Sequence, residues 1–320
     1  MSPNKTISRI AFYTFSDKSG IVRDDVIYYL EGLKAIASKI VVLIPGELSE
    51  QAKAAFEALG VSIHEQAGLL PEAETISAYD EVIFTNNTMY GPIYPFQDMF
   101  DAMRQVKCDF WSITAPPQHD KKFTSIWSIF DFTVFRKNIF LSDAWQQQST
   151  NFMQALQDAG FSYSSYCKNS PDYNDMMIDA THQLLIEQKC PVIKKAIFGM
   201  EYGRLLAYTR GDAPKKAFDY IKQHKLYDIN LILDNALATQ HHAHIKNALQ
   251  LNYFLPSDHI TQPTPKRPRT ALFFHVYYED LLSCCLTYMQ AMPDDADIYI
   301  TTSKPELLPE IKKLCVSYHL

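Results

Sequence analysis

The sequence contains one polar loop whose side chains could bind a ligand. It directly follows Glu81–Thr85, a short stretch with the β-branched and aromatic residues of a strand. The residues of interest in the loop are Asn86, Asn87, Thr88, Tyr90 and Gly91. Amide and hydroxyl groups in such a loop can bind a sugar, a diphosphate or a metal ion. Alternatively, these residues only cap the next helix and shape the turn. Position alone leaves both interpretations open.

Two other clusters could do chemistry. Lys194 and Lys195 could grip a phosphate, although a solvated turn is equally consistent with them. His241, His242 and His244 could suggest a metal site, but no Cys or carboxylate stands at ligand spacing beside them, which favours a solvated helix end. The glycine-rich dinucleotide motif, the P-loop, the zinc-protease motif and the hydrolase elbow are all missing from the sequence.

The elements that must position the polar loop alternate between strand and helix. Strand patterns at 9–15, 40–44, 61–64 and 81–85 are separated by helical patterns that start near Val26 and Ser49. This alternation predicts a parallel, doubly wound sheet. Ligands of such sheets bind beyond the carboxyl ends of the strands, which is where the polar loop and the turn around Asp17 lie.

The rest of the chain divides by composition. Strands are predicted at 110–114 and 132–135, with helices over 97–104, 140–160 and 175–188. Residues 200–255 carry only helical patterns, and 256–269 contain four prolines, which predicts a linker. A strand–helix–strand–helix–strand pattern then returns over 270–320, with its third strand at 316–319. Because this partial second unit has only three strands, we expect it to be completed by the rest of the chain, by a partner or in a longer sequence.

Composition narrows the class of protein. The 320 residues are 47% hydrophobic and 21% charged, which is typical of a globular protein. The formal net charge of -6 gives no basic field, so no nucleic-acid partner is expected. The N-terminus lacks the apolar core of a signal peptide, and the apolar runs are too short to span a membrane. The six cysteines show no CxxC spacing, which fits a reduced, cytoplasmic compartment, with peripheral docking on a membrane surface left open.

Five stretches carry a resemblance to a known family. They are 17–22 with 28–30; 79–88 with 90–92; 109–114; 191–195 with Phe198; and 275–278 with 280–281 and 299–302. In this order, over almost the whole chain, the sequence resembles the rhamnan synthesis protein F family of bacterial glycosyltransferases, which build rhamnose-containing or related surface polysaccharides.

The resemblance implies the fold and the partners. It implies a GT-A-like nucleotide-sugar domain over 1–199, followed by the helical region 200–255, the proline-rich linker 256–269 and the partial Rossmann-like unit 270–320. It also implies a nucleotide-sugar donor such as dTDP-rhamnose, and a polysaccharide or lipid-linked acceptor at the inner face of the membrane. Either a divalent cofactor, Mg²⁺ or Mn²⁺, or cationic side chains would stabilise the nucleoside diphosphate that leaves such a donor.

The chain departs from the family pattern at two places in the donor region. The family usually shows Asn-Asp-Ser where this chain has Asn86, Asn87 and Thr88, and an amide in place of the carboxylate removes a charge that would hold the metal. A Gly-Tyr-Asp-Phe-Gly-like stretch that the family carries before this strand has no counterpart in 65–78.

The implied chemistry assigns roles to individual residues. Sugar transfer needs positive charge on the leaving diphosphate and a carboxylate that deprotonates the acceptor hydroxyl. We expect Asp109 and Asp131 as candidate bases and Asp17 near the nucleotide, although each aspartate could instead be a helix cap or a surface group. Trp111 would lie in the substrate site, and the polar loop and the two lysines would bind the donor. The alternatives are a degenerate transferase domain that acts as a scaffold in polysaccharide assembly, and a Rossmann-like oxidoreductase.

Overall fold

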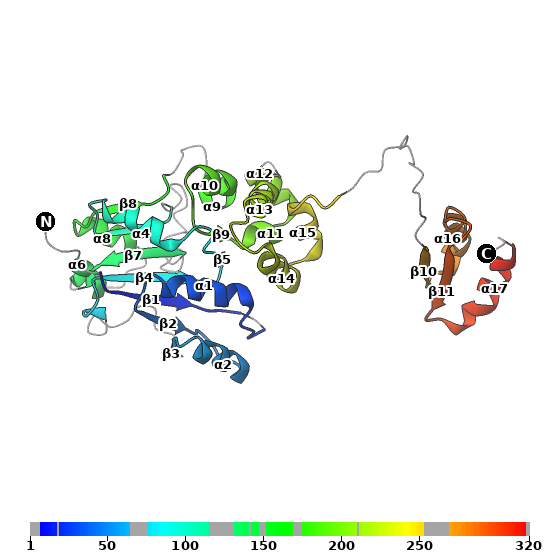
Figure 1. The fold of residues 1–320 in the computed structure, drawn as a ribbon, viewed down its shortest axis with the longest axis horizontal. Coiled ribbons are helices and arrows are strands. Elements are labelled where there is room, and N and C mark those ends of the chain that lie inside the picture. Colours follow the sequence, from blue (N-terminus) through cyan, green and yellow to red (C-terminus); the bar gives the residue numbers. More distant parts are fainter. Residues whose placement is uncertain are drawn as a thin grey trace. The chain divides into compact units, whose positions relative to one another are not determined.

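The computed structural model describes residues 7–17, 19–64, 76–114, 131–140, 142–146, 152–168, 175–209, 211–252 and 269–317. The chain forms two compact units, Met1–Tyr253 and Phe254–Leu320 (Figure 1). Every helix among the described residues is too short or too polar to cross a lipid bilayer.

A seven-stranded sheet organises the first unit, in the order β3-β2-β1-β4-β7-β6-β8. Its first four strands are β1 (Arg9–Thr14), β2 (Lys39–Leu43), β3 (Ser62–His64) and β4 (Glu81–Asn86). These four strands are parallel where they pair. They lie within one residue of the predicted strand starts and ends. β1 and β4 are marked by near-continuous apolar runs because both of their faces are covered, whereas β3 is a short edge strand with exposed side chains.

One strand reverses direction within this sheet. β7 (Phe132–Arg136) pairs antiparallel with β4 and with β6 (Phe110–Ser112), and β8 (Tyr163–Ser165) pairs parallel with β6. The mostly parallel α/β sheet predicted from the sequence is therefore confirmed. β8 was not predicted: its three residues are only half-buried, so they carry no apolar run.

Helices cover both faces of the sheet. On one face lie α1 (Asp24–Lys34), α2 (Glu50–Ala58) and α4 (Phe96–Arg104), packed on side chains such as Ala11 and Tyr13 of β1. On the other lie α6 (Lys137–Phe140), α7 (Asp143–Gln146) and α8 (Phe152–Asp158), packed on Ile10 and Phe12. Successive side chains of a strand point to opposite faces, so β1 contributes to both cores.

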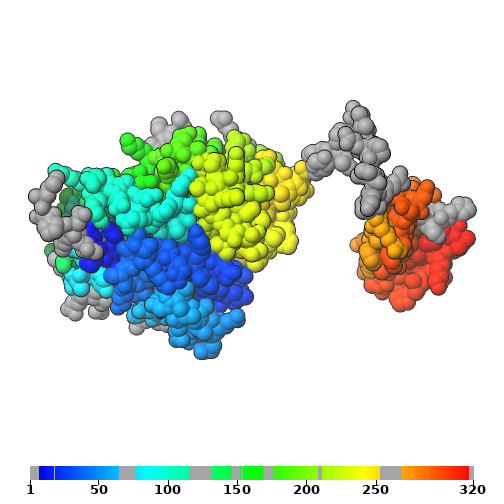
Figure 2. All heavy atoms as spheres, viewed as in Figure 1, coloured from blue at the N-terminus to red at the C-terminus, as the bar shows by residue number. Residues whose placement is uncertain are grey.

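The remainder of the first unit is helical. After α9 (Met176–Asp179) and α10 (Thr181–Glu187), a two-stranded ladder joins β5 (Met89–Tyr90) to β9 (Ile193–Lys194). Five helices follow: α11 (Ala196–Gly199), α12 (Tyr202–Thr209), α13 (Ala213–His224), α14 (Ile229–Thr239) and α15 (His242–Ala248). Side chains of β5, β9, α13 and α14 share one apolar cluster, and the yellow-green helices lie against the cyan and blue segments in Figure 2. The helical region therefore packs on the sheet domain within one unit.

The second unit is smaller. β10 (Ala271–Val276) and β11 (Asp297–Thr302) pair in parallel. Two short 3₁₀ turns, η2 (Glu279–Leu281) and η3 (Pro305–Leu307), lead into α16 (Leu282–Met289) and α17 (Leu308–Ser317). The strand predicted at 316–319 is wrong for residues 316–317, because α17 continues through them; 318–319 lie outside the described residues. So does the predicted linker, apart from its last residue, Arg269.

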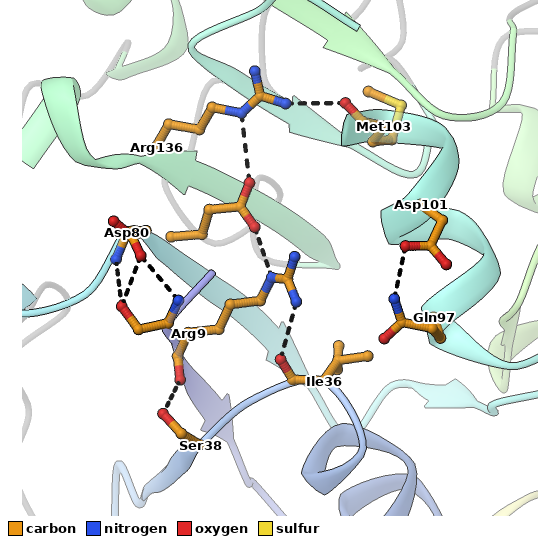
Figure 3. A network of polar contacts seen from close by, with 10 residues as sticks. Arg9, Ile36, Ser38, Asp80, Gln97, Asp101, Met103 and Arg136 are labelled. Atoms are coloured by element: carbon orange, nitrogen blue, oxygen red, sulfur yellow. Dashed lines mark hydrogen bonds and ion pairs between the residues drawn. The ribbon is translucent and has the colours of Figure 1, made fainter. Parts of the chain in front are cut away.

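A row of charged side chains crosses three neighbouring strands at the amino ends of β1 and β4. Arg9 Nε lies 2.7 Å from Glu81 Oε2, and Arg136 Nε lies 3.5 Å from Glu81 Oε1 (Figure 3). Arg136 also donates to the main-chain oxygens of Met103 and Cys108, at 3.0 and 2.6 Å. This row, in which Arg9 and Glu81 are buried and Arg136 is half-buried, joins β1, β4 and β7 at the edge of the sheet opposite the polar loop.

Candidate functional site

The carboxyl edge of the sheet gathers segments that are far apart in the sequence. Thr14 at the end of β1 is in register with Asn86 at the end of β4. Because β7 runs antiparallel to β4, its first residue, Phe132, pairs with Thr85 at the same edge. The turn around Asp17, the loop after β4 and the residue before β7 therefore line one edge, where open α/β sheets bind their ligands.

Asn87 links the loop after β4 to the end of β1 by hydrogen bonds. Its Nδ2 donates to the main-chain oxygen of Ser16 at 2.9 Å, and its Oδ1 accepts from the Ser16 N–H at 3.3 Å. The Asn87 N–H donates to the main-chain oxygen of Thr14 at 3.1 Å. A carboxylate could not make both side-chain contacts, because it has no hydrogen to donate to Ser16. Asn87 thus joins the ends of β1 and β4.

Asn86 and Thr88 form a tight turn at the surface. Asn86 Oδ1 accepts from the N–H of Thr88 at 2.9 Å and from its hydroxyl at 2.5 Å. Thr88 is exposed, so the turn is open to a ligand. Neither Asn86 nor Asn87 offers the carboxylate that Mg²⁺ or Mn²⁺ prefers. No group of three His, Cys, Asp or Glu side chains in the described part of the chain could hold a metal ion. The described residues of this turn therefore do not fit the expected cation, which stays a prediction.

Asp17 is a half-buried carboxylate at the end of β1. Burial opposes its ionisation, but hydrogen bonds from the Ser19 hydroxyl and the Ser19 N–H, at 2.8 Å for the latter, outweigh burial. With the charge of Arg23 added, the pKa of Asp17 lies below its ordinary value. Asp17 is therefore an anion held by its own turn.

Asp131 forms part of a chain of ionic contacts beside the Asn86–Thr88 turn. Lys194 Nζ lies 2.9 Å from Asp131 Oδ2 and 3.3 Å from Asp175 Oδ2. Burial opposes the charge on Lys194, but the two carboxylates outweigh it and raise the pKa of the ammonium. The Asp131 side chain is 34% exposed, so a substrate can approach it.

Lys195 forms a separate, deeper ion pair. Its ammonium contacts Asp25 Oδ2 and lies 5.2 Å from the centre of the Tyr90 ring. Asn235 donates to Asp25 Oδ1 at 3.1 Å and accepts from the Tyr90 hydroxyl at 2.8 Å. Burial lowers the pKa of Lys195, and Asp25 offsets only part of that effect. The main-chain N–H of Lys195 donates to the main-chain oxygen of Thr88 at 2.9 Å, so the Lys195–Asp25 pair lies next to the polar turn and is bonded to it.

The two consecutive lysines thus pair with different acids. β9 ends at Lys194, which contacts Asp131, whereas Lys195 is the N-cap residue of α11, with helical backbone angles (φ -58°, ψ -34°), and contacts Asp25. The solvated turn that the sequence also allowed is not observed, since the side chains are only 17% and 11% exposed.

Four predicted site residues lie elsewhere. Tyr90 and Trp111 are completely buried in two apolar clusters, and Gly91 is buried where a Cβ would approach the Pro191 oxygen to 2.8 Å. Asp109 precedes β6, which runs parallel to β4, so it lies at the opposite edge, where it accepts from the Ser162 N–H at 2.7 Å. The structure does not bring these four to the carboxyl edge.

The histidine cluster is a helix end. His241 Nδ1 accepts from the Ala243 N–H at 3.2 Å and caps α15, while His244 Nδ1 lies 2.9 Å from the Gly199 oxygen. These contacts agree with the structural interpretation of the sequence, and the rings do not converge on a common point with any carboxylate among the described residues.

The sequence did not single out three residues that contact the site: Asp175, Asp25 and Asn235. Asp175 marked only a helix start, and its Oδ1 does accept from the Met177 N–H at 3.0 Å. Asp25 and Asn235 are 210 positions apart, so no local pattern could pair them. For Asp25 and Asn235, which are buried in α1 and α14, the available sequence signal was a polar residue on the apolar side of a predicted helix.

The chain was compared with curated proteins, with solved structures and with models of protein families. A comparison with curated proteins found no match. Among solved structures, the chain is similar to 4-diphosphocytidyl-2C-methyl-D-erythritol synthase of Anaerococcus prevotii (13% identity, 52% of this chain and 89% of that one, TM-score 0.34). It is also similar to glucosyl-3-phosphoglycerate synthase of Mycobacterium tuberculosis (11% identity, 57% and 81%, TM-score 0.30). A third is the glycosyltransferase GlyE of Streptococcus pneumoniae (12% identity, 96% and 83%, TM-score 0.32).

The family model described as rhamnan synthesis protein F matches residues 70–320, which include the polar turn, Asp131, both lysines and the whole second unit. The chain belongs to the rhamnan synthesis protein F family.

Proposed function

We propose that this protein is a glycosyltransferase that moves a rhamnose-like sugar from a nucleotide donor, such as dTDP-rhamnose, to a growing surface polysaccharide. Family membership supports the class of reaction. The observation that carries the assignment is the position of Asp131, a reachable and ion-paired carboxylate at the carboxyl edge beside the Asn86–Thr88 turn. The acceptor would be the polysaccharide or a lipid-linked precursor at the inner face of the membrane.

In the proposed reaction, Asp131 is the general base. The acceptor hydroxyl passes its proton to the Asp131 carboxylate while its oxygen forms a bond to the anomeric carbon of the sugar. The bond from that carbon to the diphosphate oxygen breaks, and its electron pair leaves with the nucleoside diphosphate. Asp131 is preferred over Asp109 because Asp109 lies at the opposite edge and is bound by Ser162 and Asn138.

The donor would occupy the polar turn and the end of β1. Thr88 and Asn86 supply hydroxyl and amide groups for the sugar, and Asp17 lies beside the proposed nucleotide site. Asn87 shapes this site by joining β1 to β4. The leaving diphosphate needs positive charge, which Arg23, beside Asp17, would supply. Lys195 is paired with Asp25 and only 11% exposed, so it would act on the donor through the turn that it supports. Chelation of Mg²⁺ and Mn²⁺ tests the expected cation separately.

The test uses the purified chain with dTDP-, UDP- and GDP-sugars. Release of nucleoside diphosphate and donor affinity are measured for the wild type, Asp131→Asn and Asp109→Asn. We expect Asp131→Asn to lower the turnover by about 10²- to 10⁴-fold, the usual contribution of a general base. Asp109→Asn is the matched control, with the same chemical change at the opposite edge. Wild-type turnover in Asp131→Asn would contradict the assignment.

A second candidate function is a scaffold in polysaccharide assembly that has lost transferase activity. The amide of Asn87, committed to Ser16, favours it, because the family pattern has a carboxylate there. Saturable binding of a nucleotide sugar, with neither transfer nor hydrolysis for any donor and acceptor tested, would support the scaffold and contradict the enzyme.

A further inference from the structure

Three charged side chains form a continuous chain that ends on the proposed base. Asp175 contacts Lys194 at 3.3 Å, and Lys194 contacts Asp131 at 2.9 Å. Their side chains are 21%, 17% and 34% exposed, so exposure is greatest at Asp131. We call this set the Asp175–Lys194–Asp131 chain.

Asp175, the inner end of the Asp175–Lys194–Asp131 chain, is held by hydrogen bonds that involve main-chain N–H groups. Asp175 Oδ1 accepts from the Met177 N–H at 3.0 Å at the start of α9, and the Asp175 N–H donates to Asp179 Oδ2 at 3.0 Å. Only Oδ2 of Asp175 contacts Lys194. Asp175 is therefore fixed by contacts that do not depend on the lysine.

The middle and outer members are also held by rigid elements. Lys194 belongs to β9 and is in register with Met89 of β5. The main-chain oxygen of Asp131 accepts from the Thr85 hydroxyl at 2.9 Å, and Thr85 is in turn within 2.7 Å of the Tyr29 hydroxyl. Backbone and side chain of Asp131 are thus restrained from two directions, which is how a reacting group is held in one geometry.

Charge decides what Lys194 can do. Lys194 contributes one positive charge and the two aspartates contribute two negative charges, so the Asp175–Lys194–Asp131 chain carries a net charge of -1. A diphosphate would be repelled by both carboxylates at this place, so Lys194 is a poor diphosphate ligand. An ammonium that fixes one oxygen of a carboxylate suits a different task, since catalytic bases are commonly oriented by a third group.

We infer that Lys194, itself held by Asp175, is a positioning residue that orients the Asp131 carboxylate toward the acceptor hydroxyl. This inference rests on the proposed function of Asp131 as the base. It assigns the diphosphate to other groups, and it adds Asp175, a residue 44 positions from Asp131, to the machinery of the reaction.

The experiment separates turnover from donor affinity. Lys194→Met removes the charge and keeps the length of the side chain, Lys194→Arg keeps the charge, and Asp175→Asn keeps an oxygen for the Met177 N–H. kcat is measured at saturating donor and acceptor, and donor Kd is measured by calorimetry. We expect Lys194→Met to lower kcat by about 10- to 100-fold, as misplacement of a reacting group does, with donor Kd changed less than about twofold. Lys194→Arg should recover part of kcat.

Two outcomes would overturn the inference. One is a donor Kd weakened about tenfold with kcat retained in Lys194→Met, which would make Lys194 a diphosphate ligand. The other is wild-type kcat in both Lys194→Met and Asp175→Asn. If Lys194→Met fails to fold, Asp175→Asn decides alone, with a fall in kcat expected. Wild-type turnover in Asp131→Asn is a distinct result, because it contradicts the proposed base itself.

Discussion

Replacing Glu81 with glutamine removes a carboxylate that two arginines share at the amino edge of the sheet. The Glu81 and Arg9 side chains are only 8% and 6% exposed, and their charged atoms are 2.7 Å apart (Figure 3). Removing one partner of a buried pair leaves an uncompensated charge, which costs about 3–5 kcal/mol. Arg136 keeps its main-chain acceptors and is 26% exposed, so most of the cost comes from Arg9. We therefore expect a loss of about 3 kcal/mol, at the lower end of that range.

The chain supplies a matched control for this measurement. Glu31 and Lys34 are also 2.7 Å apart, but the Glu31 side chain is 54% exposed. Glu31→Gln should cost less than about 0.5 kcal/mol, because water and salt screen an exposed pair. The two variants differ in burial and not in the length of the contact.

Urea unfolding followed by tryptophan fluorescence is the assay. Trp111 and Trp145 are buried in the first unit, and the sequence has no tryptophan after residue 145, so the signal reports the unit that contains Glu81. For an m-value of about 3 kcal/mol/M, Glu81→Gln should lower the midpoint by about 1 M urea. A loss equal to that of Glu31→Gln would refute the claim that burial makes this pair important, and a large loss abolished by 0.5 M NaCl would refute it as well.

Three further predictions follow from other contacts. Burial raises the pKa of several tyrosines above the ordinary value of about 10, and four of these tyrosines belong to the buried core. Their stabilising effect is complete below pH 10 and is lost as the pH rises beyond it, so the free energy of unfolding should fall by about 1.4 kcal/mol per pH unit for each phenol that stays neutral, measured by urea unfolding between pH 9 and 11.5. These tyrosines are Tyr13, Tyr29, Tyr90 and Tyr227. Asn87→Asp, which restores the acid of the family pattern, should destabilise the protein by about 1–2 kcal/mol in the same assay, because a carboxylate oxygen would face the Ser16 oxygen. Unchanged stability would contradict the role of Asn87 in linking the ends of β1 and β4. Gly91→Ala should cost about 1–3 kcal/mol, since its Cβ would lie 2.8 Å from the Pro191 oxygen, whereas Gly46→Ala, with nothing within 4 Å, should be close to neutral.

Apolar runs and end signals determined much of the fold from the sequence. The runs at β1, β2 and β4 predicted strands, and the helical pattern that starts near Ser49 predicted α2, where the Ser49 hydroxyl caps the helix and accepts from the Ala52 N–H at 3.2 Å. Such signals are local, because burial on both faces and an unsatisfied helix end each leave a mark within a few residues. β5 and β9 are two residues long, too short for a periodic pattern, and the three residues of β8 are only half-buried and carry no apolar run, so none of these strands was predicted.

Only the tertiary structure distinguished Asp131 from Asp109. Each is an aspartate just before an apolar strand, so the sequence gives both the same signal. β6 runs parallel to β4 and β7 runs against it, so the start of β6 lies at the amino edge and the start of β7 at the carboxyl edge. Strand direction depends on pairing between distant segments, and no residue beside either aspartate encodes it.

The ionic contacts of the site follow the same rule. The sequence supplied Lys194 and Lys195 as two adjacent cations, and it supplied Asp25 and Asp175 as ordinary residues at helix starts. Which lysine meets which acid is decided where β9 ends, because Lys194 is paired in the β5–β9 ladder and contacts Asp175, whereas Lys195 already has the backbone angles of the following helix and contacts Asp25. The sequence alone therefore determined the layers and the edge at which chemistry is expected, while long-range pairing decided which charged groups meet there.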